Sequence, residues 1–266
     1  MIFISILILI VAIALPSFKQ DLSSQLITRI SAIIFIYSGA LALNAFYIQS
    51  IGSGLGIYSG LFHVTITSQL LDVLLFFLSA LILMSWPLIT STYYDKVVSF
   101  KPQTLLKGDG TAFVSKTTFV GEYTPRTEYC LIVLFSALGS TLLISSSDLL
   151  SMYLSIELQS FGLYILATLY RDSESSTASG LKYFLLGALA SCFILLGAGL
   201  IYSYTGLTNF ESIYSLISSL SHNIISHNII SGISLGIIFI FIGFLFKIGA
   251  APLHSWSSGP LSRDSA

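Results

Sequence analysis

The stretch "GFLFKIGAAPLHSW", residues 243–256, places Lys247 inside a long apolar run and follows it with Pro252 and His254. A charged side chain in an apolar membrane helix is costly, and a proline removes a backbone hydrogen bond from any helix that continues through it. We therefore expect a helix that breaks just after Lys247, beside backbone carbonyls that water or a cation can use. His254, which titrates near neutrality, would lie close by; an interfacial position beside Trp256 is the alternative.

The whole chain is strongly apolar. Of its 266 residues, 55% are hydrophobic and 9% are charged, and the mean hydropathy is +0.90, whereas soluble domains carry about a quarter charged residues. Several apolar runs reach the roughly 20 residues that a helix needs to cross a bilayer, and they do not alternate as barrel strands do. The sequence predicts an all-α, polytopic transmembrane bundle with about seven spans, at 2–16, 27–48, 70–89, 128–145, 148–170, 174–205 and 229–251.

Basic residues occur in every other connection between these spans. They are present in the first, third and fifth connections, as Lys19 and Arg29, as five residues in 90–127, and as Arg171, and are absent from 49–69 and 206–228. The positive-inside rule predicts this alternation for seven spans. The N-terminus then faces the compartment with few basic loops.

These features divide the chain into four parts. Three N-terminal transmembrane helices (1–89) precede a polar docking or covering loop (90–127), helices four to seven (128–256) and an atypical tail (257–266). A net charge of −1 gives no basic surface for nucleic acid. Cys130 and Cys192 lack metal-site spacing, and the repeat "SHNIISHNII" indicates a loop duplication. We expect no metal and no cofactor on this chain.

Two more charged residues lie deep in predicted spans. Glu157 follows Asp148 by nine residues, which places it about 13 Å into its helix. Lys182 is at a similar depth if its helix starts near Ser173, or near the surface if the helix starts at Ser179. The sequence makes Lys182 the nearest candidate partner for Glu157, either in a structural ion pair or in a proton relay.

Three segments together resemble a known family: "DLLSMYLSIELQSFGLYILA" (148–167), "GLKYFLLGALASCFILLGAGLIYSYTG" (180–206) and the stretch at 243–256. They are similar to chain 2 of NADH–ubiquinone oxidoreductase in its fungal mitochondrial form, an antiporter-like membrane subunit of respiratory complex I. The resemblance implies that Glu157, Lys182 and Lys247 are proton-channel residues, and His254 is added to that path.

The resemblance further implies a proton-translocating role in the mitochondrial inner membrane, with basic loops in the matrix. NADH, FMN, iron–sulfur clusters and ubiquinone would be held by partner subunits, and the chain would contact other membrane-arm subunits and lipid. The end "SSGPLSRDSA" (257–266) departs from the family pattern. We expect an N-terminal half, either a first exon read into an intron or a truncated product. A cation/proton antiporter subunit and a non-transporting scaffold remain alternatives.

Overall fold

The computed structural model describes residues 1–14, 24–48, 54–99, 128–169, 174–220 and 226–250. These residues form helices α1 (Ile2–Ala14), α2 (Ser24–Ile48), α3 (Ile66–Ser99), α4 (Glu128–Ser145), α5 (Leu149–Ala167), α6 (Glu174–Thr205), α7 (Phe210–Leu220) and α8 (Ser226–Ile248), and strands β1 (Leu55–Ile57) and β2 (Phe62–Val64). The predicted all-α membrane bundle is confirmed, apart from one short antiparallel hairpin.

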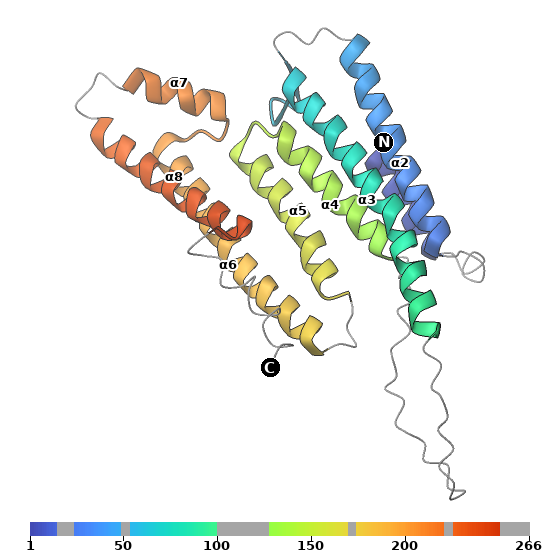
Figure 1. The fold of residues 1–266 in the computed structure, drawn as a ribbon. Helices are drawn as coiled ribbons and strands as arrows, with labels where there is room; N and C mark the ends of the chain where they lie inside the picture. Colours follow the sequence, from blue (N-terminus) through green and yellow to red (C-terminus); the bar gives the residue numbers. More distant parts are fainter. Residues whose placement is uncertain (15–23, 49–53, 100–127, 170–173, 221–225, 251–266) are drawn as a thin grey trace, which may run out of the picture.

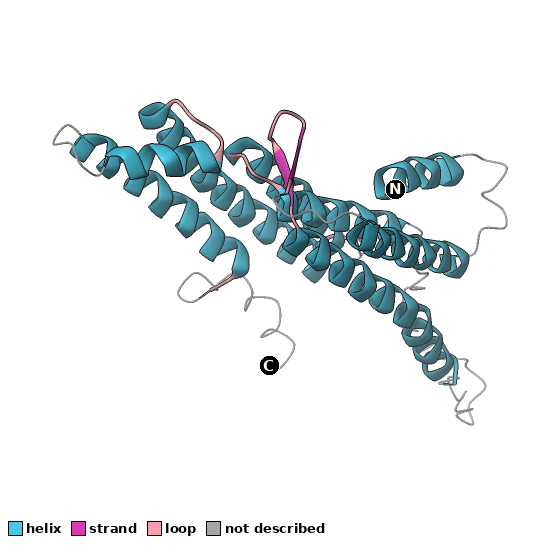
Figure 2. Cartoon of the chain, turned by 90° about the horizontal axis from the view of Figure 1, so that it is seen from above, coloured by secondary structure: helices cyan, strands magenta, loops and turns pink. Residues whose placement is uncertain are grey.

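Successive long helices run in opposite directions through the bundle (Figure 1). α2 packs on α3, α4 on α5, and α6 on α8, while α5 and α6 are also in contact. The short helix α7 and the β1–β2 hairpin lie at the same end of the bundle, opposite the end of α3 and the start of α4 (Figure 1). Figure 2 looks down on the bundle and shows the N-terminal helix at its edge.

Six of the described helices are long and apolar enough to cross a membrane: α2, α3, α4, α5, α6 and α8. The first predicted span, 2–16, corresponds to α1, which has 13 residues and is therefore only about 20 Å long. That is shorter than a hydrocarbon core of about 30 Å. Isoleucines and leucines are exposed along all these helices except α4, as expected for surfaces that face lipid or other membrane proteins.

Glycines bring α6 and α8 together. A side chain at Gly197 would lie 2.5 Å from the carbonyl oxygen of Gly236, and one at Gly236 would lie 2.8 Å from the carbonyl oxygen of Gly197. Close backbone approach through small residues is typical of helix pairs in membranes. Gly197 is therefore a contact position between the two helices, whereas a side chain at Gly199 on the same helix would have nothing within 4 Å.

The β1–β2 hairpin contacts two connections, the one between α4 and α5 and the one between α6 and α7. We call the four residues that make these contacts the hairpin clamp: Gly60, Leu61, Ser147 and Asn209. The Ser147 amide donates to the Leu61 carbonyl (3.1 Å), and the Asn209 side chain donates to the Gly60 carbonyl (3.3 Å). The Ser147 hydroxyl also donates to Gly60. Helices α3, α5 and α7 are thereby held at one end of the bundle.

The turn between β1 and β2, which includes Gly60 of the hairpin clamp, has a left-handed backbone. Tyr58 and Ser59 have φ values of 53° and 57°, and Gly60 has a φ of 86°. Left-handed conformations are unfavourable for residues with a side chain. The hydrogen bonds that the Gly60 and Leu61 carbonyls accept offset this cost.

We expect Asn209→Ala to loosen α7 without unfolding the bundle. Asn209 caps α7, because its Oδ1 accepts from the Glu211 amide at 2.9 Å, and the loss of such a cap costs about 1 kcal/mol. Hydrogen exchange of residues 206–220 should become faster, while that of α4 is unchanged. Ser215→Ala, which removes an exposed hydroxyl from the same helix, is the control. Equal exchange in the two variants contradicts the prediction.

Two parts of the fold differ from the sequence prediction. Helix α3 continues to Ser99, beyond the predicted end of the third span at 89. The connection 206–228 contains α7, whose Ile213 packs with Leu149 and Ile201. Hydropathy over a window of membrane length detects neither feature, because a helix that is polar or short can form outside the bilayer. Helix α6 ends at Thr205, as the predicted span does, and Gly206 follows it in a left-handed conformation.

Candidate functional site

Glu157 and Lys247 form an ion pair between α5 and α8. The Lys247 Nζ atom lies 2.8 Å from Glu157 Oε1 and 2.8 Å from Ser160 Oγ. The side chains of Lys247 and Glu157 are only 14% and 16% exposed. The pair is therefore compensated in charge and has little access to solvent, which is how a membrane protein accommodates two charges at depth.

Helix α5 carries Glu157 near its middle. Asp148 caps the helix by accepting from the Leu150 amide, and the Ser151 side chain completes a capping box. Glu157 is the ninth residue of the 19-residue helix, about 13 Å from that end. The Ser160 hydroxyl donates to the Ile156 carbonyl at 2.7 Å, which leaves its oxygen to accept from Lys247.

Lys247 is in the last turn of α8, where the helix ends abruptly. Gly249 adopts a φ of 70°, its amide donates to the Phe246 carbonyl, and the Ala250 amide donates to the Leu245 carbonyl. These two bonds define a Schellman C-cap. The partial negative charge of the helix end favours the lysine ammonium there.

The predicted helix break after Lys247 is thus confirmed, although its cause differs from the one expected. Glycine in the left-handed conformation ends α8 at Ile248. Pro252 and His254 lie outside the described residues. Helix α8 therefore ends at Ile248, four residues before Pro252 in the sequence.

The expected pairing of Glu157 with Lys182 is wrong. Gly187 faces α5, because a side chain there would overlap Tyr164, and Lys182 lies about 140° away around the α6 axis. Gly180 also packs on α5, at Thr168, and Lys182, two residues later, lies about 160° away from it around the α6 axis. Lys182 is exposed on the far side of α6, and Lys247 provides the charge that compensates Glu157.

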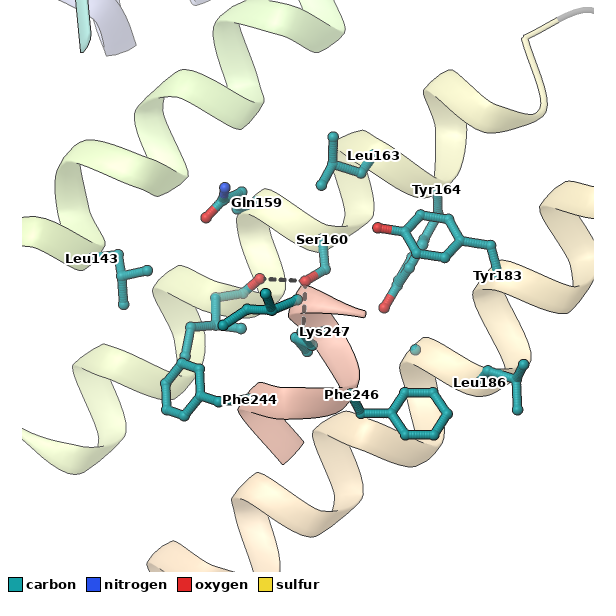
Figure 3. Close-up of a pocket in the computed structure, with 13 residues that line it drawn as sticks. Leu143, Gln159, Ser160, Leu163, Tyr164, Tyr183, Leu186, Phe244, Phe246 and Lys247 are labelled. Carbon is teal, nitrogen blue, oxygen red and sulfur yellow. Dashed lines mark hydrogen bonds between the residues drawn. The ribbon is translucent and has the colours of Figure 1, made fainter. Parts of the chain in front are cut away.

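A cavity of about 320 Å³ adjoins the ion pair. It lies among α4, α5, α6 and α8, and its polar lining groups are Gln159, Ser160, Tyr164, Tyr183 and Lys247 (Figure 3). Apolar residues complete the lining: Leu143, Ile156, Leu163, Leu186, Gly187, Phe244, Phe246 and Ile248. The sequence alone does not reveal this cavity, because its walls come from four different helices.

The residues that the structure describes contain no candidate metal site. No group of three His, Cys, Asp or Glu side chains is placed to hold a metal ion there, and Cys130 and Cys192 are free. Asp72 in α3 is partly buried, and its Oδ1 atom has neither solvent contact nor a hydrogen-bond partner. The same is true of the Oε1 atom of Gln69.

The chain is similar to known membrane proteins in sequence and in fold. Residues 146–259 match the family described as "NADH:quinone oxidoreductase/Mrp antiporter, TM". The chain is 44% identical over 97% of its length to NADH-ubiquinone oxidoreductase chain 2 of Rhizopus oryzae, covering 45% of that protein. It is 38% identical to NADH-quinone oxidoreductase subunit N of Parvibaculum lavamentivorans over 61% of this chain and 32% of that one.

Solved structures agree with the sequence relatives. Respiratory complex I from Thermus thermophilus contains a chain that matches 96% of this one with a TM-score of 0.60 and 25% identity, 46% of that chain being covered. An archaeal membrane-bound sulfane sulfur reductase shares the fold alone, at a TM-score of 0.63 and 22% identity over 96% of this chain and 45% of that one. The chain spans less than half the length of the curated relatives it matches. In sequence and fold, the chain is similar to membrane subunits of the NADH:quinone oxidoreductase/Mrp antiporter family.

Proposed function

We propose that the chain is an antiporter-like, membrane-arm subunit of a proton-translocating NADH:ubiquinone oxidoreductase and contributes a proton path. Relatives named as chain 2 and subunit N of that enzyme support the assignment. The observation that carries it is the ion pair of Glu157 with Lys247, about halfway along a membrane-spanning helix. Both side chains can gain and lose a proton.

The pair gives each group control over the charge of the other. When Lys247 gives a proton to water, Glu157 loses its compensating charge and the site favours proton uptake. When Lys247 is charged, the carboxylate is stabilised at 2.8 Å. Ser160 fixes the ammonium through a second bond of 2.8 Å. The proton path would also include Lys182, as the sequence resemblance implies, and His254, as a histidine close to Lys247 in the sequence.

Electron transfer belongs to partner subunits in this proposal. The chain would bind no NADH, FMN, iron–sulfur cluster or ubiquinone itself, and would act in the mitochondrial inner membrane beside other membrane-arm subunits. A cation/proton antiporter of the same family is the second candidate, because the matching family description includes Mrp antiporters. A non-transporting scaffold, with Glu157 and Lys247 as a structural pair, is the third.

Affinity purification of the tagged chain from solubilised membranes tests the assignment. We expect a complex that oxidises NADH, whereas an Mrp-type antiporter would purify without NADH oxidation and would contradict the proposal. Lys247→Met should then lower proton pumping more than NADH oxidation. Pumping that survives this change in a fully assembled complex would favour the scaffold.

We expect the two ends of the bundle to face opposite compartments, with 90–127 in the matrix and 206–228 and the N-terminus in the intermembrane space. Ser215 is in α7, Glu128 is the first residue of α4, and both are exposed. Helix α7 and the start of α4 lie at opposite ends of the bundle (Figure 1). In a background without Cys130 and Cys192, an impermeant maleimide should label Ser215→Cys from the intermembrane side and Glu128→Cys from the matrix side. Labelling of both variants from one side refutes this topology.

A further inference from the structure

Beyond the ion pair, the cavity brings two tyrosines from different helices together. The rings of Tyr164 on α5 and Tyr183 on α6 meet edge to face, with centroids 4.9 Å apart. Figure 3 shows both rings at the cavity, beside Ser160 and Lys247. Edge-to-face contact accounts for the ring positions. This contact does not depend on the hydroxyl groups, because two phenylalanine rings could pack in the same way.

The position of Tyr164 depends on Gly187. A side chain at Gly187 would overlap the Tyr164 hydroxyl, with the Tyr164 ring carbons Cζ and Cε1 at 2.6 and 2.8 Å. The Tyr164 hydroxyl therefore lies against the backbone of α6, at the wall of the cavity that Gly187 also lines. The sequence predicts close helix packing at Gly187; the structure identifies the packed group as a tyrosine.

The cavity is large enough to hold several waters, because it measures about 320 Å³ and one water takes up about 30 Å³ in the liquid. Its lining is mostly apolar, but five side chains supply polar partners. The Lys247 ammonium has three N–H donors, of which two go to Glu157 and Ser160. Because Lys247 also lines the cavity, its remaining N–H can donate to water there.

We propose that Tyr164 and Tyr183 relay protons between Lys247 and water in this cavity, an inference that rests on the proposed function. A tyrosine hydroxyl donates and accepts at the same time. In each step a water accepts a proton from the Lys247 ammonium as an N–H bond breaks. The tyrosine oxygen then accepts a proton from that water while its own O–H proton passes to the next water. Each hydroxyl ends neutral, and one positive charge has moved.

Removing either hydroxyl while keeping its ring tests the relay. In the assembled complex, Tyr164→Phe and Tyr183→Phe should each lower protons pumped per NADH by about fivefold, the factor for losing one hydrogen bond of about 1 kcal/mol. Assembled-complex abundance should stay unchanged. The double variant should be no worse than the worse single variant, since one broken link stops a chain; structural effects would add instead.

Three further variants make the outcome decisive. Tyr202→Phe removes an exposed hydroxyl from the same helix α6 and should leave pumping unchanged. Gly187→Ala keeps both hydroxyls but displaces that of Tyr164, and should lower pumping as Tyr164→Phe does. If Glu157→Gln lowers pumping and the tyrosine variants do not, the relay is wrong and the proposed function stands. If Glu157→Gln also has no effect, the proposed function itself fails.

Discussion

Glu157→Gln should lower proton pumping by about a hundredfold, the lower end of the range for removing a proton-transfer group, while the complex still assembles. Glutamine keeps the shape of the side chain and an oxygen that can accept from Lys247 at the distance seen now, 2.8 Å. It loses the negative charge and the titrating proton. Protons pumped per NADH oxidised, measured in reconstituted vesicles beside complex abundance, separate these effects.

A double-mutant cycle identifies the partner of Glu157. Glu157→Gln with Lys247→Met should be no worse than the worse single variant, because the two side chains form one unit. Lys182→Met is also expected to lower pumping, but its effect should add to that of Glu157→Gln, since the two residues are not in contact. Coupling to Lys182 without coupling to Lys247 would contradict the structure. Pumping that falls only as far as assembly falls would indicate a structural pair.

Gly197→Ala should be strongly destabilising, since its methyl group would meet backbone atoms. That group would lie 2.5 Å from the Gly236 carbonyl oxygen and 2.9 Å from the Ile240 amide nitrogen of α8. Backbone cannot turn aside as a flexible side chain can, so α6 and α8 must separate, at a cost of about 1–3 kcal/mol. The abundance and thermal stability of the assembled complex should both decrease.

Gly199→Ala is the matched control for this change. It lies two residues away on α6, has nothing within 4 Å of its new methyl group, and gains up to about 1 kcal/mol in helix propensity. Its stability should be equal to that of the parent chain or higher. Equal loss in both variants would mean that α6 and α8 do not approach as closely as the structure shows.

Helices that cross the membrane were predictable because their signal is local. A run of about 20 apolar residues satisfies the bilayer wherever it occurs in the chain, and six such runs became helices α2, α3, α4, α5, α6 and α8. The hairpin and α7 were missed since they are short and depend on contacts with distant residues. Ile213 of α7 is buried against Leu149 and Ile201, which no window of sequence contains.

The sequence predicted which charged residues belong to the candidate site, but not which of them form the ion pair. Glu157 and Lys247 stand out as charges in apolar helices, which a sequence displays directly. Their contact joins residues 90 positions apart, whereas Lys182 is closer in sequence but on the wrong face of α6. Choosing a partner requires the rotation and offset of each helix, and these are set by contacts such as that of Gly187 with Tyr164.

The separation of the paired charges along the chain has a consequence for biosynthesis. Helices α4 and α5 are joined by only three residues, 146–148, so they enter the bilayer together as a pair, with Glu157 inside. Lys247 is translated 90 residues later, about 5–20 s at ordinary synthesis rates. During that interval the acid of the future ion pair is in the membrane without its base. The insertion machinery, or a proton on Glu157, must neutralise it until α8 arrives.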